Sequence, residues 1–334
     1  MALTLLDMQR LRKDPFEKGV LDVFMAECDI SKVLPIKTIG TVEVSRRRNN
    51  GLPTLGWRKR GEAFPAVAGT TSDTVTDQVF AMGATIDIDK TDMRDKNLIE
   101  DPLAERTKAA VKAAAWTFND AVINGDHATD EDMPEGLKVR IAAGPSAQII
   151  YANSSTASLD VSPASGPTTA ELYTWLDKID EAIYACDGHQ ADICLTDADF
   201  IRAYKSALRR LSLYKDVPME KPYTNPSGMR STGSDFYNKS IFEYNGVKFF
   251  DMGLKVDQST HIVGTETVGD ACRPAYFVKM GDDYFHGIQQ YALEVSKSFM
   301  LDDGVTYRTT IDWPVGFRHV HPASFSKLSG SKVA

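Results

Sequence analysis

Residues 101–125 read DPLAERTKAAVKAAAWTFNDAVING and predict the clearest helix in the chain. Asp101 is a suitable N-cap, Pro102 takes the first helical position, and Asn124-Gly125 ends the helix. At a rise of roughly 1.5 Å per residue, the helix would be about 33 Å long. Its many alanines allow close approach of a sheet or a second helix. One apolar stripe keeps helical spacing and comprises Leu103, Ala110, Val111, Ala114, Phe118 and Val122.

Alternating apolar and polar residues predict strands on both sides of this helix. Residues 37–45 and 74–90 alternate, which favours a two-stranded ribbon with a long excursion of chain between its strands. Residues 289–301 and 305–313 alternate around Asp302-Asp303-Gly304, and this second pair is long enough to lie along the ribbon.

Helical patterns recur near the N-terminus and in the second half of the chain. Residues 1–36 are loosely amphipathic, are broken by Pro15 and closed by Pro35, and indicate an N-terminal arm. Thr168 and Glu171 form a capping box at the start of another helix.

Short strands and turns follow that helix. Residues 191–196 predict a strand, after which Thr196 or Asp197 caps a further helix. Asn245-Gly246 is the strongest short-range hairpin signal. The segment AYFVKMGDDYFHGI predicts a second hairpin that turns at 281–283. Helices and antiparallel strands thus occur in separate blocks, which is an α+β pattern.

Residues 46–60 (RRRNNGLPTLGWRKR) hold six positive charges and no negative one, in a chain of formal net charge −8. The rest of the chain therefore carries −8 minus 6, that is −14. Because charges are costly to bury, this segment should project as a loop toward an acidic surface, and another copy of the chain offers one. Contact between a loop of one copy and the body of the next builds rings and larger assemblies. The alternative is a disordered surface loop.

The overall composition is that of a soluble globular protein of 334 residues, 43% of them hydrophobic and 25% charged. The acidic balance argues against a body that coats nucleic acid. The chain begins without a signal-type apolar segment, and no apolar run is long enough to span a bilayer. Four cysteines lack disulfide-like spacing, which predicts a reduced, cytosolic product; they are Cys28, Cys186, Cys194 and Cys272.

Motifs of catalysis are missing, so we predict a protein that is not an enzyme, with no cofactor and no catalytic residue. The sequence has no G-x-S-x-G elbow, H-E-x-x-H pair, Walker loop or G-x-G-x-x-G turn. Three segments invite a metal hypothesis, but simpler interpretations are preferred for each. The acidic stretch 126–135 suits a solvated loop, Cys186 with Cys194 and His189 suits buried thiols near a helix end, and His319 with His321 suits isolated surface histidines.

Taken in order, these elements resemble the major capsid proteins of tailed double-stranded DNA bacteriophages, which have the Hong Kong 97 fold. The resemblance covers most of the chain. It rests on the long helix leading into FNDAVINGD and Gly136-Leu137, on the segment from VKFFDMG through AYFVKMGDDYFHGIQ, and on the closing DWPVGFRHVHPASFSKL. It implies an α+β fold with an N-terminal arm (1–36), an extended loop and its ribbon (37–90), a peripheral domain with a long spine helix (91–139 and 286–334), and an axial domain (140–285).

The resemblance also implies a function. Such proteins self-assemble into pentamers and hexamers that form an icosahedral shell around viral double-stranded DNA, without sequence-specific binding and without a membrane. The chain would be assembled in the host cytoplasm and located in the virion. The extended loop would lie over a neighbouring subunit, with ion pairs from Arg46, Arg47, Arg48, Arg58, Lys59 and Arg60 and apolar anchors at Trp57 and Phe64.

Further partners are expected from the same resemblance. They are a portal, a decoration protein and, because the arm starts at Met1, a separate scaffolding protein. Lys59 is a conceivable donor for an isopeptide crosslink, but no matching Asn and Glu can be identified. Three alternatives stay open: an encapsulin-like cellular nanocompartment shell, a DNA-binding protein that uses the 46–60 loop, and a hydrolase whose triad the sequence does not show.

Overall fold

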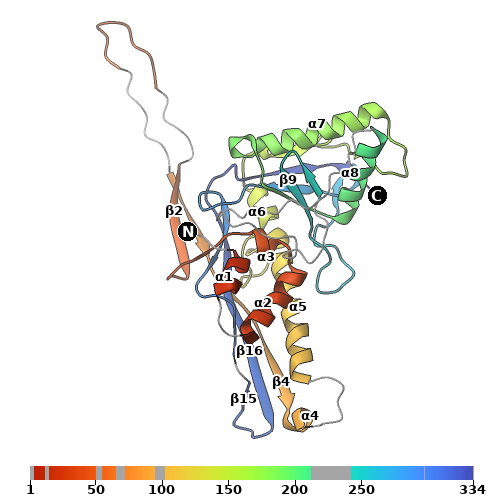
Figure 1. The fold of residues 1–334 in the computed structure, drawn as a ribbon. Coiled ribbons are helices and arrows are strands. Elements are labelled where there is room, and N and C mark those ends of the chain that lie inside the picture. Colours follow the sequence, from red (N-terminus) through yellow and green to blue (C-terminus); the bar gives the residue numbers. More distant parts are fainter. Residues whose placement is uncertain are drawn as a thin grey trace.

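The computed structural model describes residues 4–11, 15–49, 55–64, 72–94, 102–211, 242–296 and 298–333. Two six-stranded sheets organise this part of the chain, with a long helix beside the first sheet and two helices over the second (Figure 1). Within the described residues, no helix is long and apolar enough to cross a membrane.

The first sheet is built around one long strand, β16 (Thr306–His319). On one edge β16 pairs antiparallel with β4, from Thr306 opposite Asp89 to Val315 opposite Phe80. Its other edge pairs with three shorter strands in turn, and β1 adds to β13 in parallel. The bounds are β1 (Ile36–Thr38), β4 (Phe80–Asp89), β13 (Phe285–Gln289), β14 (Glu294–Val295) and β15 (Phe299–Met300).

The predicted ribbon of 37–45 and 74–90 is confirmed in part, because residues 37 and 38 lie in β1 beside β13 and the second strand is divided into β3 and β4. β2 (Glu43–Asn49) pairs antiparallel with β3 (Ser72–Gln78), whereas β4 leaves that ribbon and lies along β16. The expectation that the second strand pair lies along the ribbon is therefore confirmed only for β16, which pairs with β4 of the predicted 74–90 strand. The short helix α4 (Lys90–Arg94) follows β4.

The long helix is confirmed as α5 (Pro102–Asn124); its predicted N-cap, Asp101, lies outside the described residues. Val111, Phe118 and Val122 are buried, and the other members of the predicted stripe pack against the same core. Phe118 lies 5.1 Å from Trp313 of β16, measured between ring centroids, so the helix is fixed to the centre of the sheet by aromatic contact.

The predicted N-terminal arm, residues 1–36, also contributes its described residues to this core. It forms α1 (Leu5–Leu11), α2 (Pro15–Glu27) and α3 (Ile30–Val33) before β1. Phe24 of α2 is buried edge-on against Trp313, with 5.5 Å between the centroids. Glu27, at the end of α2, accepts a hydrogen bond from Trp116 and pairs with Lys112 of α5 at 3.1 Å.

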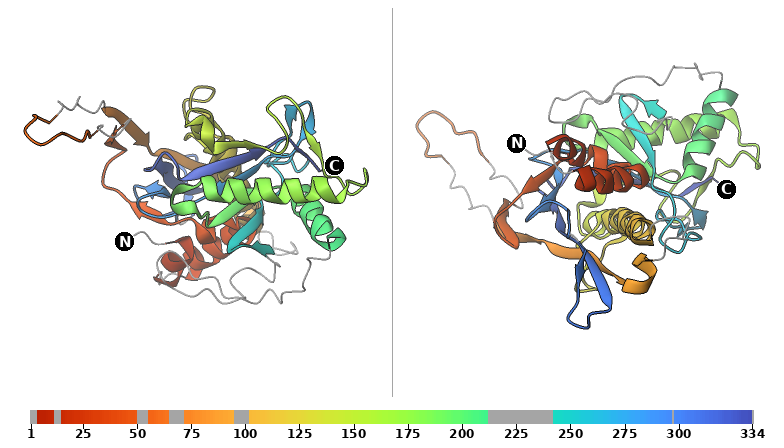
Figure 2. Two further views of the ribbon diagram at one scale, coloured as in Figure 1. Left: turned by 90° about the horizontal axis from the view of Figure 1, so that it is seen from above. Right: turned by 60° about the horizontal axis from the view of Figure 1, so that its bottom comes forward.

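The second sheet has the order β5-β17-β12-β7-β9-β8. Two helices, α7 (Thr169–Ala185) and α8 (Ala198–Arg210), cover one face and enclose a second core around Trp175 and Tyr204 (Figures 1 and 2). Strand β7 shows why both faces are buried, because Ile193 belongs to the first core and Cys194 to the second. The bounds are β5 (Ile149–Tyr151), β7 (Ile193–Thr196), β8 (Phe242–Tyr244), β9 (Val247–Asp251), β12 (Ala275–Val278) and β17 (Phe325–Ser329).

Short elements connect these layers. α6 (Leu137–Ala142) follows α5 after a turn, and β10 pairs with β11 while β18 pairs with β6. The remaining bounds are β6 (Leu159–Asp160), β10 (Glu266–Val268), β11 (Asp270–Cys272), β18 (Ser331–Lys332), and the two 3₁₀ turns Ser146–Gln148 and Asp187–His189.

Local sequence signals were mostly correct. Thr168 and Glu171 form the reciprocal capping box of α7, and Asp197 is the N-cap residue of α8. Asn245 and Gly246 have φ values of 50° and 81°, as the tight turn between β8 and β9 requires.

The second predicted hairpin is wrong. β12 pairs with β7 and β17 in the second sheet, whereas β13 pairs with β1 and β16 in the first. Every residue of β12 and β13 is buried, so both faces of each strand need cover, which an isolated hairpin does not supply.

His286 makes the first sheet sensitive to acid. It lies fully buried in β13 opposite Arg318, its Nδ1 donates to the Gly281 carbonyl at 3.2 Å, and its Nε2 has no hydrogen-bond partner among the described residues. Burial, aided by the nearby Arg318 and Lys37 and opposed by Asp282, lowers the pKa of His286 from 6.5 to about 4. The unfolded chain therefore binds this proton more readily than the folded one between these pH values.

We predict that the free energy of unfolding falls as pH drops from 6.5 toward 4, by on the order of 3 kcal/mol from this group. His286→Asn removes that share of the pH dependence while offering an amide donor near the position of Nδ1. Denaturant unfolding at pH 7 and pH 4.5 measures it, with His321→Asn as the control because His321 is exposed. If the free energy of unfolding falls by the same amount between pH 7 and pH 4.5 in wild type and in His286→Asn, the assignment to His286 is contradicted.

Candidate functional site

The extended loop is the most prominent projection of the molecule. Ribbon β2–β3 leaves the body beside β16, and residues 55–64 lie at its far end, away from both sheets (Figures 1 and 2). All ten of these residues are exposed. Residues 55–64 thus project from the body and are accessible to another molecule.

The tip combines apolar and basic side chains. Trp57 is fully exposed, and Leu55 and Phe64 are 81% and 71% exposed. Arg58 lies 4.7 Å above the Phe64 ring, and its Nη1 donates to the Glu62 carbonyl at 2.9 Å. Arg58 therefore closes the turn on one side, while Trp57 remains free of burial. A surface of this kind suits burial against a partner.

The six predicted basic residues occupy two different places. Arg58, Lys59 and Arg60 are exposed together at the tip. Arg47 is exposed in β2, where Arg48 lies opposite Asp73 in the strand register.

Arg46 differs from the other basic residues of the loop. Its guanidinium donates to the carbonyls of His319 and Val320, at the end of β16 in the same chain. One of the six cations thus holds the ribbon to its own body, which a count of charges does not reveal.

An exposed acidic surface follows α5. Asp126 accepts hydrogen bonds from the Thr129 hydroxyl at 2.8 Å and the Ala128 amide at 3.0 Å, and these donors lower the pKa of Asp126. The predicted solvated acidic loop is therefore an ordered turn. Its exposed acidic side chains are Asp130, Glu131, Asp132 and Glu135.

Metal ligands do not gather in the described part of the chain, where no group of three or more suitable side chains occurs. Cys186 and Cys194 are buried, and burial raises the pKa of Cys186 to about 11. They are buried thiols, as predicted. His319 is also buried, with its ring 4.3 Å from that of Phe325, so the interpretation of two surface histidines is wrong for this residue.

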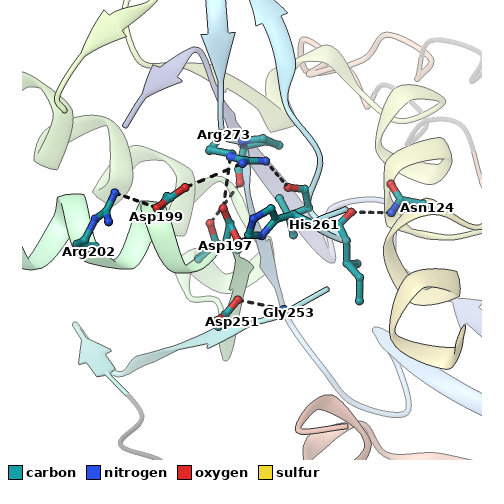
Figure 3. Close-up of polar contacts among 12 residues, drawn as sticks. Asn124, Asp197, Asp199, Arg202, Asp251, Gly253, His261 and Arg273 are labelled. Atoms are coloured by element: carbon teal, nitrogen blue, oxygen red, sulfur yellow. Dashed lines mark hydrogen bonds and ion pairs between the residues drawn. The ribbon is translucent and has the colours of Figure 1, made fainter. Parts of the chain in front are cut away.

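A polar network that the sequence did not suggest centres on Asp197. This N-cap carboxylate is 1% exposed and lies 2.8 Å from Nδ1 of His261 and 3.3 Å from Nε of Arg273 (Figure 3). Arg273 also faces Asp199 at 4.0 Å, and Asp199 pairs with the exposed Arg202 at 2.9 Å. The buried carboxylate is thus held between two basic side chains.

The same network connects the segment 252–264 to α5 beside the first sheet and to the start of α8 beside the second sheet. Arg273 Nη1 donates to the Val263 carbonyl at 3.1 Å, and Asn124 at the end of α5 donates to the Ile262 carbonyl at 2.7 Å (Figure 3). Lys255 pairs with Asp120 of α5 at 3.2 Å. This segment therefore links the long helix to the start of α8. No short motif signals it, because its partners are distant in sequence.

Comparison with known proteins shows what kind of fold carries this loop. No family model and no curated protein matches the chain. Solved structures match over nearly their full length. The SrpI encapsulin complex from Synechococcus elongatus PCC 7942 is 12% identical, with a TM-score of 0.60, covering 100% of this chain and 98% of that one.

Capsids are also among the matching structures. The capsid of a native GTA particle is 13% identical, with a TM-score of 0.58, covering 93% of this chain and 90% of that one. The capsid of Myoviridae phage XM1 is 12% identical, with a TM-score of 0.53, covering 88% and 89%. The chain therefore has a mixed α/β fold of the Hong Kong 97 type, as the sequence predicted.

We predict that Arg273→Met lowers the free energy of unfolding by about 3 kcal/mol at pH 7, because it leaves the buried Asp197 without the guanidinium that faces it. Arg202→Met is the matched control. It breaks an exposed pair and should cost less than about 1 kcal/mol. Denaturant titration of both variants measures the difference, and equal losses would contradict the role given to Arg273.

Proposed function

We propose that the chain is a major capsid protein that self-assembles into pentamers and hexamers and forms an icosahedral shell around viral double-stranded DNA. The observation that carries this proposal is the likeness to an encapsulin and to two capsids over 88% to 100% of this chain, joined to an exposed apolar and basic loop that projects from the body. The role is structural rather than enzymatic.

In this proposal the loop of one copy lies over the next copy in the same ring. Arg58, Lys59 and Arg60 meet an acidic surface there, and the turn 126–135 is a dense acidic segment of the described body. Each exposed ion pair contributes only about 0 to 1 kcal/mol, whereas burying a side chain the size of Phe contributes about 1.5 to 3 kcal/mol. Trp57 and Phe64 therefore supply most of the affinity, and the cations add a smaller part that salt screens.

The remaining assignments follow from the same proposal. Residues 1–36 are the arm, 37–90 the extended loop and ribbon, 91–139 with 286–334 the peripheral domain, and 140–285 the axial domain around the ring centre. The location is the virion after assembly in the host cytoplasm. A scaffolding protein, a portal and a decoration protein are the partners.

An encapsulin-like nanocompartment shell is the second candidate, and the likeness to the SrpI encapsulin favours it. The two candidates differ in their contents. Shells isolated from the native source hold nuclease-protected double-stranded DNA if the chain is a viral capsid protein, and an enzyme if it is a nanocompartment protein.

We predict that the purified chain, expressed with its neighbouring genes, forms uniform closed shells in negative-stain electron microscopy. The variant Arg58→Glu/Lys59→Glu/Arg60→Glu should abolish or strongly reduce closed shells, because it reverses the charge that faces an acidic neighbour. Trp57→Ala should weaken assembly, and more so in high salt than in low salt, because salt also screens the remaining ion pairs.

The matched control is Lys59→Arg/Arg60→Lys, which keeps every charge, leaves Arg58 in place against Phe64 and should assemble. Monomers or dimers under every condition would contradict the shell proposal. Tight, salt-sensitive DNA binding by the subunit would then favour the DNA-binding alternative.

A further inference from the structure

The root of the extended loop is the part of ribbon β2–β3 around Arg46 and Asp77, next to the body. It makes contacts with the body that the tip, residues 55–64, does not make. A two-stranded ribbon is marginal by itself, so the direction of β2–β3 depends on what holds its base. Seven residues of β3 span about 23 Å, and a tilt of about 10° at the root moves the far end of the ribbon by roughly 4 Å. Such a shift exceeds the tolerance of a hydrogen bond.

Arg140 of α6 joins three elements at this root. Its Nη1 lies 2.9 Å from Oδ1 of Asp77 in β3, and its Nη2 donates to the Phe317 carbonyl of β16 at 2.9 Å. Its Nε donates to the Glu135 carbonyl, at the end of the acidic turn, at 3.1 Å. The guanidinium therefore donates hydrogen bonds to the ribbon, to the central strand β16 and to the turn after α5.

This ion pair is buried, unlike those on the surface of the sheet. The side chains of Arg140 and Asp77 are 8% and 2% exposed. Asp77 Oδ2 is buried and has no hydrogen-bond partner among the described residues, which leaves Arg140 as the cation that compensates this carboxylate there. A planar guanidinium with fixed donor directions transmits orientation better than a flexible ammonium.

Two further features fix the same place. Arg46 of β2 donates to the carbonyls of His319 and Val320, so both strands of the ribbon are attached to the end of β16. Gly316 of β16 lets the chain cross closely, since a Cβ there would lie 2.2 Å from the Gln78 carbonyl oxygen. Side chains and backbone thus constrain the ribbon together.

We propose that Arg140 is a positioning residue that sets the direction of the extended loop, with Arg46 as its second attachment, and so decides where the tip meets a second copy of the chain. The inference rests on the proposed function for its partner. The attachment itself is a property of the single subunit and can be tested there.

The test uses the full chain with Arg140→Met/Asp77→Asn. Removing both members of a buried pair leaves no uncompensated charge, so the fold is kept. The matched control is Arg308→Met/Asp87→Asn, which removes an arginine–aspartate pair of 2.6 Å between β16 and β4 away from the loop root. Amide hydrogen exchange is measured on dissociated subunits, and particle diameters are measured by electron microscopy after assembly.

We expect exchange in residues 43–49 and 72–78 to become about tenfold faster in the Arg140 variant and to stay unchanged there in the control. We also expect a broader distribution of particle diameters, or open sheets. Wild-type exchange in the ribbon, or faster exchange in both variants alike, would overturn the proposal. If the wild-type chain forms no shells, the proposed function fails, while the exchange comparison still decides the role of Arg140.

Discussion

The pairing of β16 on both of its edges is the constraint on which the rest of this structure depends. One edge holds β4 over ten residue pairs, and the other holds β13, β14 and β15 in succession. Trp313 of the same strand anchors the arm through Phe24 and the long helix through Phe118. The end of the strand receives Arg46 and Arg140 from the root of the loop. A change that loosened this strand would therefore disturb both the packing of the core and the attachment of the loop.

How much the sequence could predict depended on the range of the interaction. The helix 102–124 and the turn at Asn245-Gly246 were predictable because periodicity, caps and backbone preference act within a few residues. The separation of β12 and β13 into different sheets was not, because their order along the chain suggests a hairpin and their partners lie elsewhere in the chain. Burial of both strands was visible only as an apolar run, which does not say which strands are neighbours.

The candidate site was likewise predictable only in those features that depend on residues close together in the sequence. A cluster of cations without counter-charges predicted a projecting loop, and the exposed tip at 55–64 agrees with it. Charge counting could not distinguish Arg46, which holds the root, from Arg58, which shapes the tip. It also could not find Arg140 or Asp197, whose partners are 63 and 76 residues away in the pairs with Asp77 and Arg273. A single charged residue within a helix or at its N-cap carries no sequence signature of such a pair.

Rigidity at the root and weakness at the tip are complementary requirements for an assembly made of many copies. Exposed ion pairs are individually weak and screened by salt, so a wrongly placed copy can leave. Weak contacts alone do not select one geometry, however. Buried pairs add little net stability but impose direction, because breaking them leaves a charge without compensation. Holding the loop in one direction before contact also reduces the entropy lost on association. The geometry of assembly would then reside in the buried pair of Arg140 and Asp77, and its reversibility in the exposed residues 55–64.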